Sequence, residues 1–175
     1  MTRTVKPHST PAVDDFFAGV DEMRALLDRE LQDPERRRGR LAAIAGELLK
    51  PRAKGELCRW LVSELAVAIG ANVASILVRE HGAFPLVSGH TVGVPPEGSV
   101  IPTLDEVVRL AANEAELFAS SGAVVVPLKG IDGIVGALWL VIRTPLDAGS
   151  AELLRAIADT AGVALEQAIL LHAMG

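Results

Sequence analysis

The most constraining feature of this sequence is an apolar stretch at residues 124–143, VVVPLKGIDGIVGALWLVIR. A membrane-spanning helix needs about 20 residues that are nearly free of charge, but Lys129 and Asp132 lie near the middle of this stretch. The pattern Lys-Gly-Ile-Asp-Gly between two β-branched runs is typical of a hairpin with a short turn. We therefore predict two antiparallel strands, at residues 124–128 and 134–142.

The second predicted strand does not alternate between apolar and polar residues. Every residue from 134 to 142 is apolar except Gly136. A strand that is apolar on both sides is covered on both faces. The sheet is therefore expected to form a middle layer of the fold.

Periodicity and end signals predict the remaining elements. Apolar residues at positions 16, 20, 23, 27 and 31 indicate a helix from Asp14. Asp33-Pro34 is typical of a helix restart, and Lys50-Pro51 of a helix end. Further helices are predicted at residues 54–69, from the Thr103–Glu106 capping box to about 118, and at 147–172, with strands at 73–79 and 84–91.

This order of elements predicts an α/β (α+β) fold with three layers, α/β/α, around a central antiparallel sheet, and with extra N-terminal helices. We expect residues 1–13 to be a flexible lead. Residues 14–50 are then a helical segment that serves dimerisation, and residues 51–175 are the main domain.

Composition excludes several classes of function. At 175 residues one domain is expected, and aromatic residues make up only 3% of the chain. Few aromatics and no broad basic surface argue against a nucleic-acid partner. The basic cluster at Arg36, Arg37, Arg38 and Arg40 either contacts phosphate or forms a solvated helix face.

The single cysteine, Cys58, excludes an intrachain disulfide and a thiolate metal cluster. No metal site is predicted. The N-terminal sequence MTRTVKPHSTPAV lacks the apolar core of a signal peptide. We therefore expect a cytoplasmic protein that does not associate with a membrane.

Over about residues 40–172 the sequence resembles the GAF domain family. The resemblance rests on the helix and strand ELCRWLVSELAVAIGANVASILVREHG, the hairpin quoted above, and the closing helix SAELLRAIADTAGVALEQAIL. It implies a sensory or regulatory domain. Members of this family bind small ligands of several kinds, or bind none and dimerise.

The chain also departs from particular members of the family. The Asn-Lys-x-Asp signature of the cyclic-nucleotide-binding members has no equivalent, and Cys58 lies away from the position of the cysteine in bilin-binding members. The family's enzyme that reduces free methionine sulfoxide works through several cysteines, and one cysteine cannot form and resolve an internal disulfide. The resemblance therefore does not identify a cofactor, and the cofactor stays unknown at this point.

Four residues are predicted to contact a ligand. Ser88 and His90 lie near the end of the second strand, where imidazole donates to an anion, ligates haem, or is simply exposed. Arg109 on the central helix either reaches an anionic ligand or is solvated. Trp139 either forms the floor of a pocket or belongs to the core.

The first and last helices have more apolar surface than one domain buries, which predicts a homodimer. The function expected is a non-enzymatic sensory or regulatory domain that binds a small ligand and signals through these flanking helices. The alternative is a ligand-free scaffold that binds a signalling protein. An enzyme is disfavoured because the sequence contains no catalytic motif.

Overall fold

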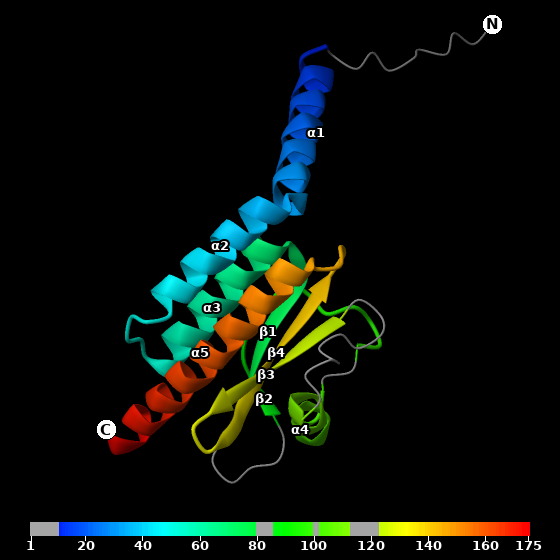
Figure 1. The fold of residues 1–175 in the computed structure, drawn as a ribbon. Helices are drawn as coiled ribbons and strands as arrows, with labels where there is room; N and C mark the ends of the chain where they lie inside the picture. Colours follow the sequence, from blue (N-terminus) through cyan, green and yellow to red (C-terminus); the bar gives the residue numbers. More distant parts are fainter. Residues whose placement is uncertain (1–10, 80–85, 100–101, 113–122) are drawn as a thin grey trace, which may run out of the picture.

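The computed structural model describes residues 11–79, 86–99, 102–112 and 123–175 (Figure 1). Five helices and four strands follow one another along this described part. In chain order they are α1 (Pro11–Gln32), α2 (Pro34–Glu47), α3 (Lys54–Ile69), β1 (Ala71–Arg79), β2 (Leu86–Val92), α4 (Leu104–Ala112), β3 (Ala123–Gly130), β4 (Gly133–Ile142) and α5 (Ala148–Met174).

The four described strands form one antiparallel sheet in the order β2-β1-β4-β3. The apolar stretch at residues 124–143 is the β3–β4 hairpin, as predicted. Pro127 has no N–H to donate, and it lies on β3, at the edge of this sheet, where proline is tolerated. No helix in the described part of the chain is long and apolar enough to cross a membrane.

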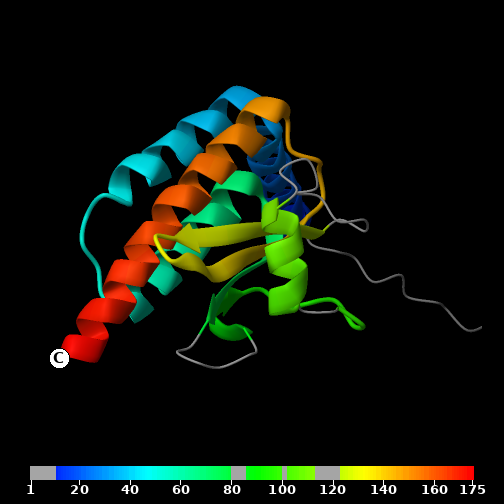
Figure 2. The ribbon, with the colours of Figure 1, turned by 60° about the horizontal axis from the view of Figure 1, so that its bottom comes forward.

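Alternation along the strands divides the core into two clusters. On β4, Leu138 and Leu140 belong to the main cluster, beneath α2, α3 and α5. Ala137 and Trp139 belong to a second cluster, which includes Val107 of α4. Both faces of β4 are therefore buried, and the predicted α/β/α layering is confirmed. Figures 1 and 2 show α2, α3 and α5 on one side of the sheet and α4 on the other.

End signals in the sequence account for several element boundaries. The predicted capping box is present, because the Glu106 N–H donates to Thr103 Oγ1 at 3.3 Å and the Thr103 N–H donates to Glu106 Oε2 at 3.0 Å. Helix α3 ends at Gly70, whose φ of 64° is left-handed. The Asp33 carboxylate accepts the Glu35 N–H at 3.1 Å and starts α2.

Most boundaries differ from the sequence prediction by one to three residues, and the largest differences are at the N-terminal helices. Helix α1 begins at Pro11 rather than Asp14, because proline is compatible with the first turn of a helix. Helix α2 ends at Glu47, before Lys50. The continuation of the central helix to residue 118 and the start of the second strand at residue 84 lie outside the described residues.

The predicted N-terminal helical segment, residues 14–50, divides into two parts at Asp33. Leu41, Ile44 and Leu48 are almost fully buried in the main cluster, so the α2 part completes the core of the domain. Helix α1 instead projects away from the sheet, as Figure 1 shows. Its principal contacts are with α2 and α3.

Helix α5 is held against the β3–β4 hairpin by close backbone contact and by a carboxylate. A Cβ added at Gly162 would lie only 2.6 Å from the Lys129 backbone nitrogen, so only glycine permits this approach. Glu166 accepts the N–H of Ile131 at 2.8 Å and that of Asp132 at 3.3 Å. The hairpin turn and the middle of α5 are thereby tied together.

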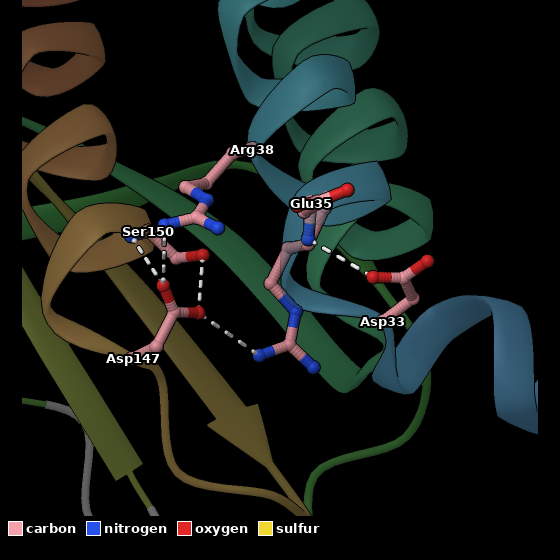
Figure 3. A network of polar contacts seen from close by, with 6 residues as sticks. Asp33, Glu35, Arg38, Asp147 and Ser150 are labelled. Carbon is pink, nitrogen blue, oxygen red and sulfur yellow. Dashed lines mark hydrogen bonds and ion pairs between the residues drawn. The ribbon is translucent and has the colours of Figure 1, made fainter.

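A polar network joins the first turns of α2 and α5 (Figure 3). Asp147 is the N-cap of α5 and accepts the Ser150 N–H at 3.1 Å and the Ser150 hydroxyl at 2.6 Å. The Nη1 atoms of Arg37 and Arg38 lie 3.8 and 4.0 Å from its two carboxylate oxygens. The hydrogen bond from the Ser150 hydroxyl is the main reason that the pKa of the Asp147 carboxyl is below its usual value.

The close contact at Gly162 predicts an unusual response to alanine. Gly162→Ala is expected to lower the free energy of unfolding by about 1–3 kcal/mol, because the new methyl group must push α5 away from β3. Gly39→Ala is the matched control, since a Cβ there meets open space and alanine favours the helix by about 0.5–1 kcal/mol. Urea unfolding measures both variants. Equal stabilisation by the two substitutions would contradict the contact.

Asp147→Ala is expected to cost about 1 kcal/mol of stability at neutral pH, through the lost N-cap. Because the folded-state pKa is lowered, the stabilisation is complete above the unfolded pKa of about 4 and is lost as the pH falls through the folded pKa. The difference from the unsubstituted protein therefore shrinks in acid. Urea unfolding across this pH range tests it, with the exposed Asp159→Ala on α5 as the control. A penalty that is independent of pH would disprove a role for the carboxylate charge.

Candidate functional site

The α4 face of the sheet carries a row of residues that is polar at one end. Across the strands the row reads Thr91, Ser75, Trp139 and Val125, from β2 to β3. Helix α4 packs on β3 and β4, over the apolar end of the row. The hydroxyl end therefore lies beside α4, on β1 and β2.

Three hydroxyl groups form a chain at this end. Ser75 Oγ lies 2.8 Å from Thr91 Oγ1, which lies 3.0 Å from Ser88 Oγ. The Ser75 hydroxyl also donates to the backbone carbonyl of His90 at 3.3 Å. Ser75 is only 2% exposed, whereas Thr91 and Ser88 are exposed, so the chain runs from the buried sheet to the surface.

The direction of the protons in this chain decides what it presents to a ligand. If Ser75 donates to the His90 carbonyl, Thr91 donates to Ser75 and Ser88 donates to Thr91. Ser88 then offers lone pairs to an incoming donor. If the order reverses, Ser75 donates to Thr91 instead of the His90 carbonyl, and Thr91 donates to Ser88. Ser88 then offers its proton to an acceptor. The chain can therefore offer either an acceptor or a donor to a ligand, and each bond polarises the next.

Trp139 lies next to Ser75 in the row and is only 4% exposed. It packs in the second cluster with Val107 of α4. The residues of this cluster and those of the hydroxyl chain are all uncharged. Their chemistry is that of an apolar surface with a polar end, which is the usual composition of a small-molecule site.

The structure does not bring all four predicted ligand contacts together. Ser88 and Trp139 lie on the same face, linked through Thr91 and Ser75. Arg109 is exposed on α4, two residues after the fully buried Val107, and so lies on about the opposite side of that helix.

His90 pairs with Ile76, a residue of the main cluster beneath α3. The neighbouring Gly89 also faces α3, because a Cβ there would lie 3.1 Å from Cys58 Sγ. The register shift between Ile76 and Leu77 marks a bulge in β2 at this point. His90 reaches the hydroxyl chain through its backbone carbonyl.

Sequence reasoning missed Ser75 and Thr91. The available signal was a serine inside the otherwise apolar run Val73–Val78, Val-Ala-Ser-Ile-Leu-Val, and a threonine three residues after Ser88. From the sequence alone, neither residue predicts a contact with the other, because the β1–β2 register decides which residues lie opposite each other. The bulge at Gly89 shifts that register by one residue, so simple alternation along β2 places the side chains wrongly.

A second concave surface lies on the other side of the molecule, between α2 and α3. This α2/α3 groove has a volume of about 370 Å³. Its apolar lining comprises Ala43, Ile44, Trp60, Val67 and Ala68, and its charged lining comprises Arg40, Glu47 and Glu64. The Arg52 guanidinium stacks on the ring of Trp60 at 3.9 Å, which is a cation–π contact.

Cys58 is only 1% exposed and packs as a small apolar side chain. Burial raises the pKa of its thiol, and Lys54 opposes this only in part. The thiol is therefore protonated at neutral pH and is a poor nucleophile. Among residues 11–79, 86–99, 102–112 and 123–175, no cluster of three His, Cys, Asp or Glu side chains is placed to hold a metal ion.

No protein-family model matches the sequence, and no curated protein matches it. Solved structures do match the fold. The second GAF domain of DevS from Mycobacterium smegmatis is 26% identical with a TM-score of 0.54, and the match covers 70% of this chain and 99% of that domain. The GAF domain of an Acinetobacter phosphoenolpyruvate-protein phosphotransferase is 20% identical with a TM-score of 0.58, over 78% and 95% of the two chains.

A third match is the free methionine-R-sulfoxide reductase from Neisseria meningitidis, solved with its substrate. It is 18% identical with a TM-score of 0.58, over 79% of this chain and 93% of that one. The antiparallel sheet, its two helical layers and these matches together show that the chain has the fold of a GAF domain. The resemblance drawn from the sequence is confirmed at the level of the fold.

The hydroxyl chain predicts a measurable coupling between two strands. Ser75→Ala and Thr91→Val are each expected to lower the free energy of unfolding by about 0.5–1.5 kcal/mol, because each removes the bond between β1 and β2. The double variant should cost less than the sum of the two, since one bond is lost only once. Urea unfolding of all four proteins measures the cycle. Strict additivity would show that the two hydroxyls do not interact.

Proposed function

We propose that this protein is a non-enzymatic sensory or regulatory domain that binds a small neutral ligand beside α4. In this proposal the ligand contacts Ser88 and Trp139, and the signal leaves through the flanking helices α1 and α5 of a homodimer. The observation that carries the proposal is the hydroxyl chain, which connects the exposed Ser88 to the buried Ser75 beside Trp139. Solved domains of this fold come from a sensor histidine kinase and from phosphotransferases, which supports a regulatory role.

The contacts of β4 supply a route for such a signal. Trp139 lies on β4, and the β3–β4 turn is tied to α5 by Glu166. Backbone contact between Gly162 and Lys129 leaves little room for independent movement. A ligand that displaces β4 therefore also displaces α5, provided that it binds one position of the hairpin more tightly than the other.

The absence of enzymatic activity belongs to the proposal and is supported by the chemistry of Cys58. The fold is shared with a methionine sulfoxide reductase, but a shared fold does not carry activity. The one thiol of this chain is buried and protonated, which disfavours redox or nucleophilic chemistry at that position.

A second candidate function is that of a scaffold that binds a protein without a ligand. The observation that favours it is the exposed apolar face of α1, which includes Phe16, Val20 and Met23. Large exposed apolar patches mark surfaces for protein–protein contact. Both candidates use the flanking helices, and they differ only in whether the α4 face is occupied.

Native mass spectrometry of the purified protein, with an absorbance spectrum, separates the two candidates. We expect a dimer that carries added mass. Ser88→Ala and Thr91→Val should each reduce the occupied fraction at least tenfold, because the first removes the proposed polar contact and the second removes the hydroxyl that holds Ser88. Arg109→Ala is the matched control on α4. The fraction of Arg109→Ala protein that carries ligand should equal that of the unsubstituted protein if the ligand is neutral. A lower fraction would indicate an anionic ligand instead.

A dimer without added mass in the unsubstituted protein would favour the scaffold. A monomer would contradict the first candidate, because its signal depends on contact between two copies, whereas a scaffold would then have to bind a different protein. Dimer formation that survives Ser88→Ala shows that ligand binding and dimer formation are separate properties of the fold.

A further inference from the structure

The hydroxyl chain of Ser75, Thr91 and Ser88 ends, on its buried side, at a group that can only accept a hydrogen bond. The Ser75 hydroxyl lies 3.3 Å from the backbone carbonyl of His90, and Ser75 is only 2% exposed. A carbonyl has lone pairs and no proton, whereas a hydroxyl both donates and accepts. The two ends of the chain are therefore not equivalent, and the carbonyl favours one direction of the protons.

In the favoured direction, every proton of the chain has a partner within the protein. Ser75 donates to the His90 carbonyl, Thr91 donates to Ser75 at 2.8 Å, and Ser88 donates to Thr91 at 3.0 Å. The exposed Ser88 then presents lone pairs at the surface, while its proton is already used. A ligand that donates a hydrogen bond to Ser88 therefore leaves all of these bonds intact.

A ligand that can only accept costs the chain one hydrogen bond. If all the hydroxyls reverse, the His90 carbonyl loses the proton of the buried Ser75. If Ser88 alone turns its proton to the ligand, Thr91 loses its donor instead. One such bond corresponds to a difference in affinity of about threefold to tenfold.

The surroundings of the chain also disfavour a charged donor. The side chains of the second cluster, which includes Trp139 next to Ser75, are all uncharged. An ammonium ion would lose part of its hydration there without an opposite charge to replace it. A neutral O–H or N–H group is therefore the donor that this face favours.

We propose that Ser75 determines the specificity of this site, so that Ser88 binds neutral ligands with an O–H or N–H group in preference to ligands that only accept. Ser75 acts through Thr91, which lies between it and Ser88. The inference rests on the proposed ligand site beside α4 and specifies the chemical class of its ligand. Alcohols, amides and N–H heterocycles belong to this class, whereas ethers, ketones and anions do not.

Ser75→Ala is expected to remove this preference. Without the Ser75 hydroxyl, Thr91 is free to donate its proton to Ser88, and Ser88 can donate to a ligand without the loss of another bond. The variant should therefore bind an acceptor more tightly, relative to a donor, than the unsubstituted protein does. Thr91→Val frees the Ser88 proton directly and should lower the preference in the same way.

Indole and acetophenone are suitable probes, because they are similar in size and the first only donates a hydrogen bond whereas the second only accepts one. Titrations followed by nuclear magnetic resonance give each dissociation constant from the shifts of the Ser88 and Thr91 amide signals. The ratio of the acetophenone constant to the indole constant should be about threefold to tenfold higher in the unsubstituted protein than in Ser75→Ala. Differences intrinsic to the two probes cancel, since the same probes are compared in both proteins.

Ser63→Ala is the matched control, because Ser63 lies on α3, and α3 covers the opposite side of the sheet (Figure 2). Its ratio should equal that of the unsubstituted protein. Circular dichroism and the binding of indole verify that Ser75→Ala is folded. An equal ratio in Ser75→Ala and the unsubstituted protein overturns the role of Ser75 and leaves the proposed ligand site standing. If neither probe shifts the two amide signals of the unsubstituted protein, the ligand site fails, and this inference fails with it.

Discussion

The pairing of β1 with β4 at the centre of the sheet is the constraint on which the rest of the structure depends. Because both strands are covered on both faces, their residues must be apolar or must satisfy their own hydrogen bonds. Leu138 and Leu140 fill the larger core, and Trp139 fills the smaller one. The larger core packs against α2, α3 and α5. The smaller core does not extend to the β2 side of the α4 face, where hydroxyl groups lie instead.

Ser75 is the exception on β1, and it underlies the ligand site that we propose on that face. A buried hydroxyl costs free energy unless it is hydrogen-bonded, and Ser75 is bonded to Thr91 and to the His90 carbonyl. Its partners lie on an edge strand, with a bulge at Gly89. Thr91 in turn lies 3.0 Å from the exposed Ser88, where the proposed ligand would contact the chain.

The two sides of the molecule are connected through α5 and the hairpin. Glu166 and Gly162 hold the β3–β4 turn against α5, so the displacement that we propose on the α4 face would reach the helical layer. Helix α2 lies in that layer and contacts α5 through the network around Asp147 (Figure 3). In the proposed function, ligand binding and the packing of the flanking helices would act on one connected set of contacts.

Local signals in the sequence determined most of the fold. Lys-Gly-Ile-Asp-Gly placed the hairpin, Thr103 and Glu106 placed the start of α4, and the apolar run of β4 required cover on both faces. These features act over a few residues, so they can be read from the chain alone. The meeting of Ser75 with Thr91, the separation of Arg109 and His90 from that face, and the groove opposite were decided only by the tertiary structure. Each depends on strand register or helix rotation, which contacts between residues distant in the sequence determine.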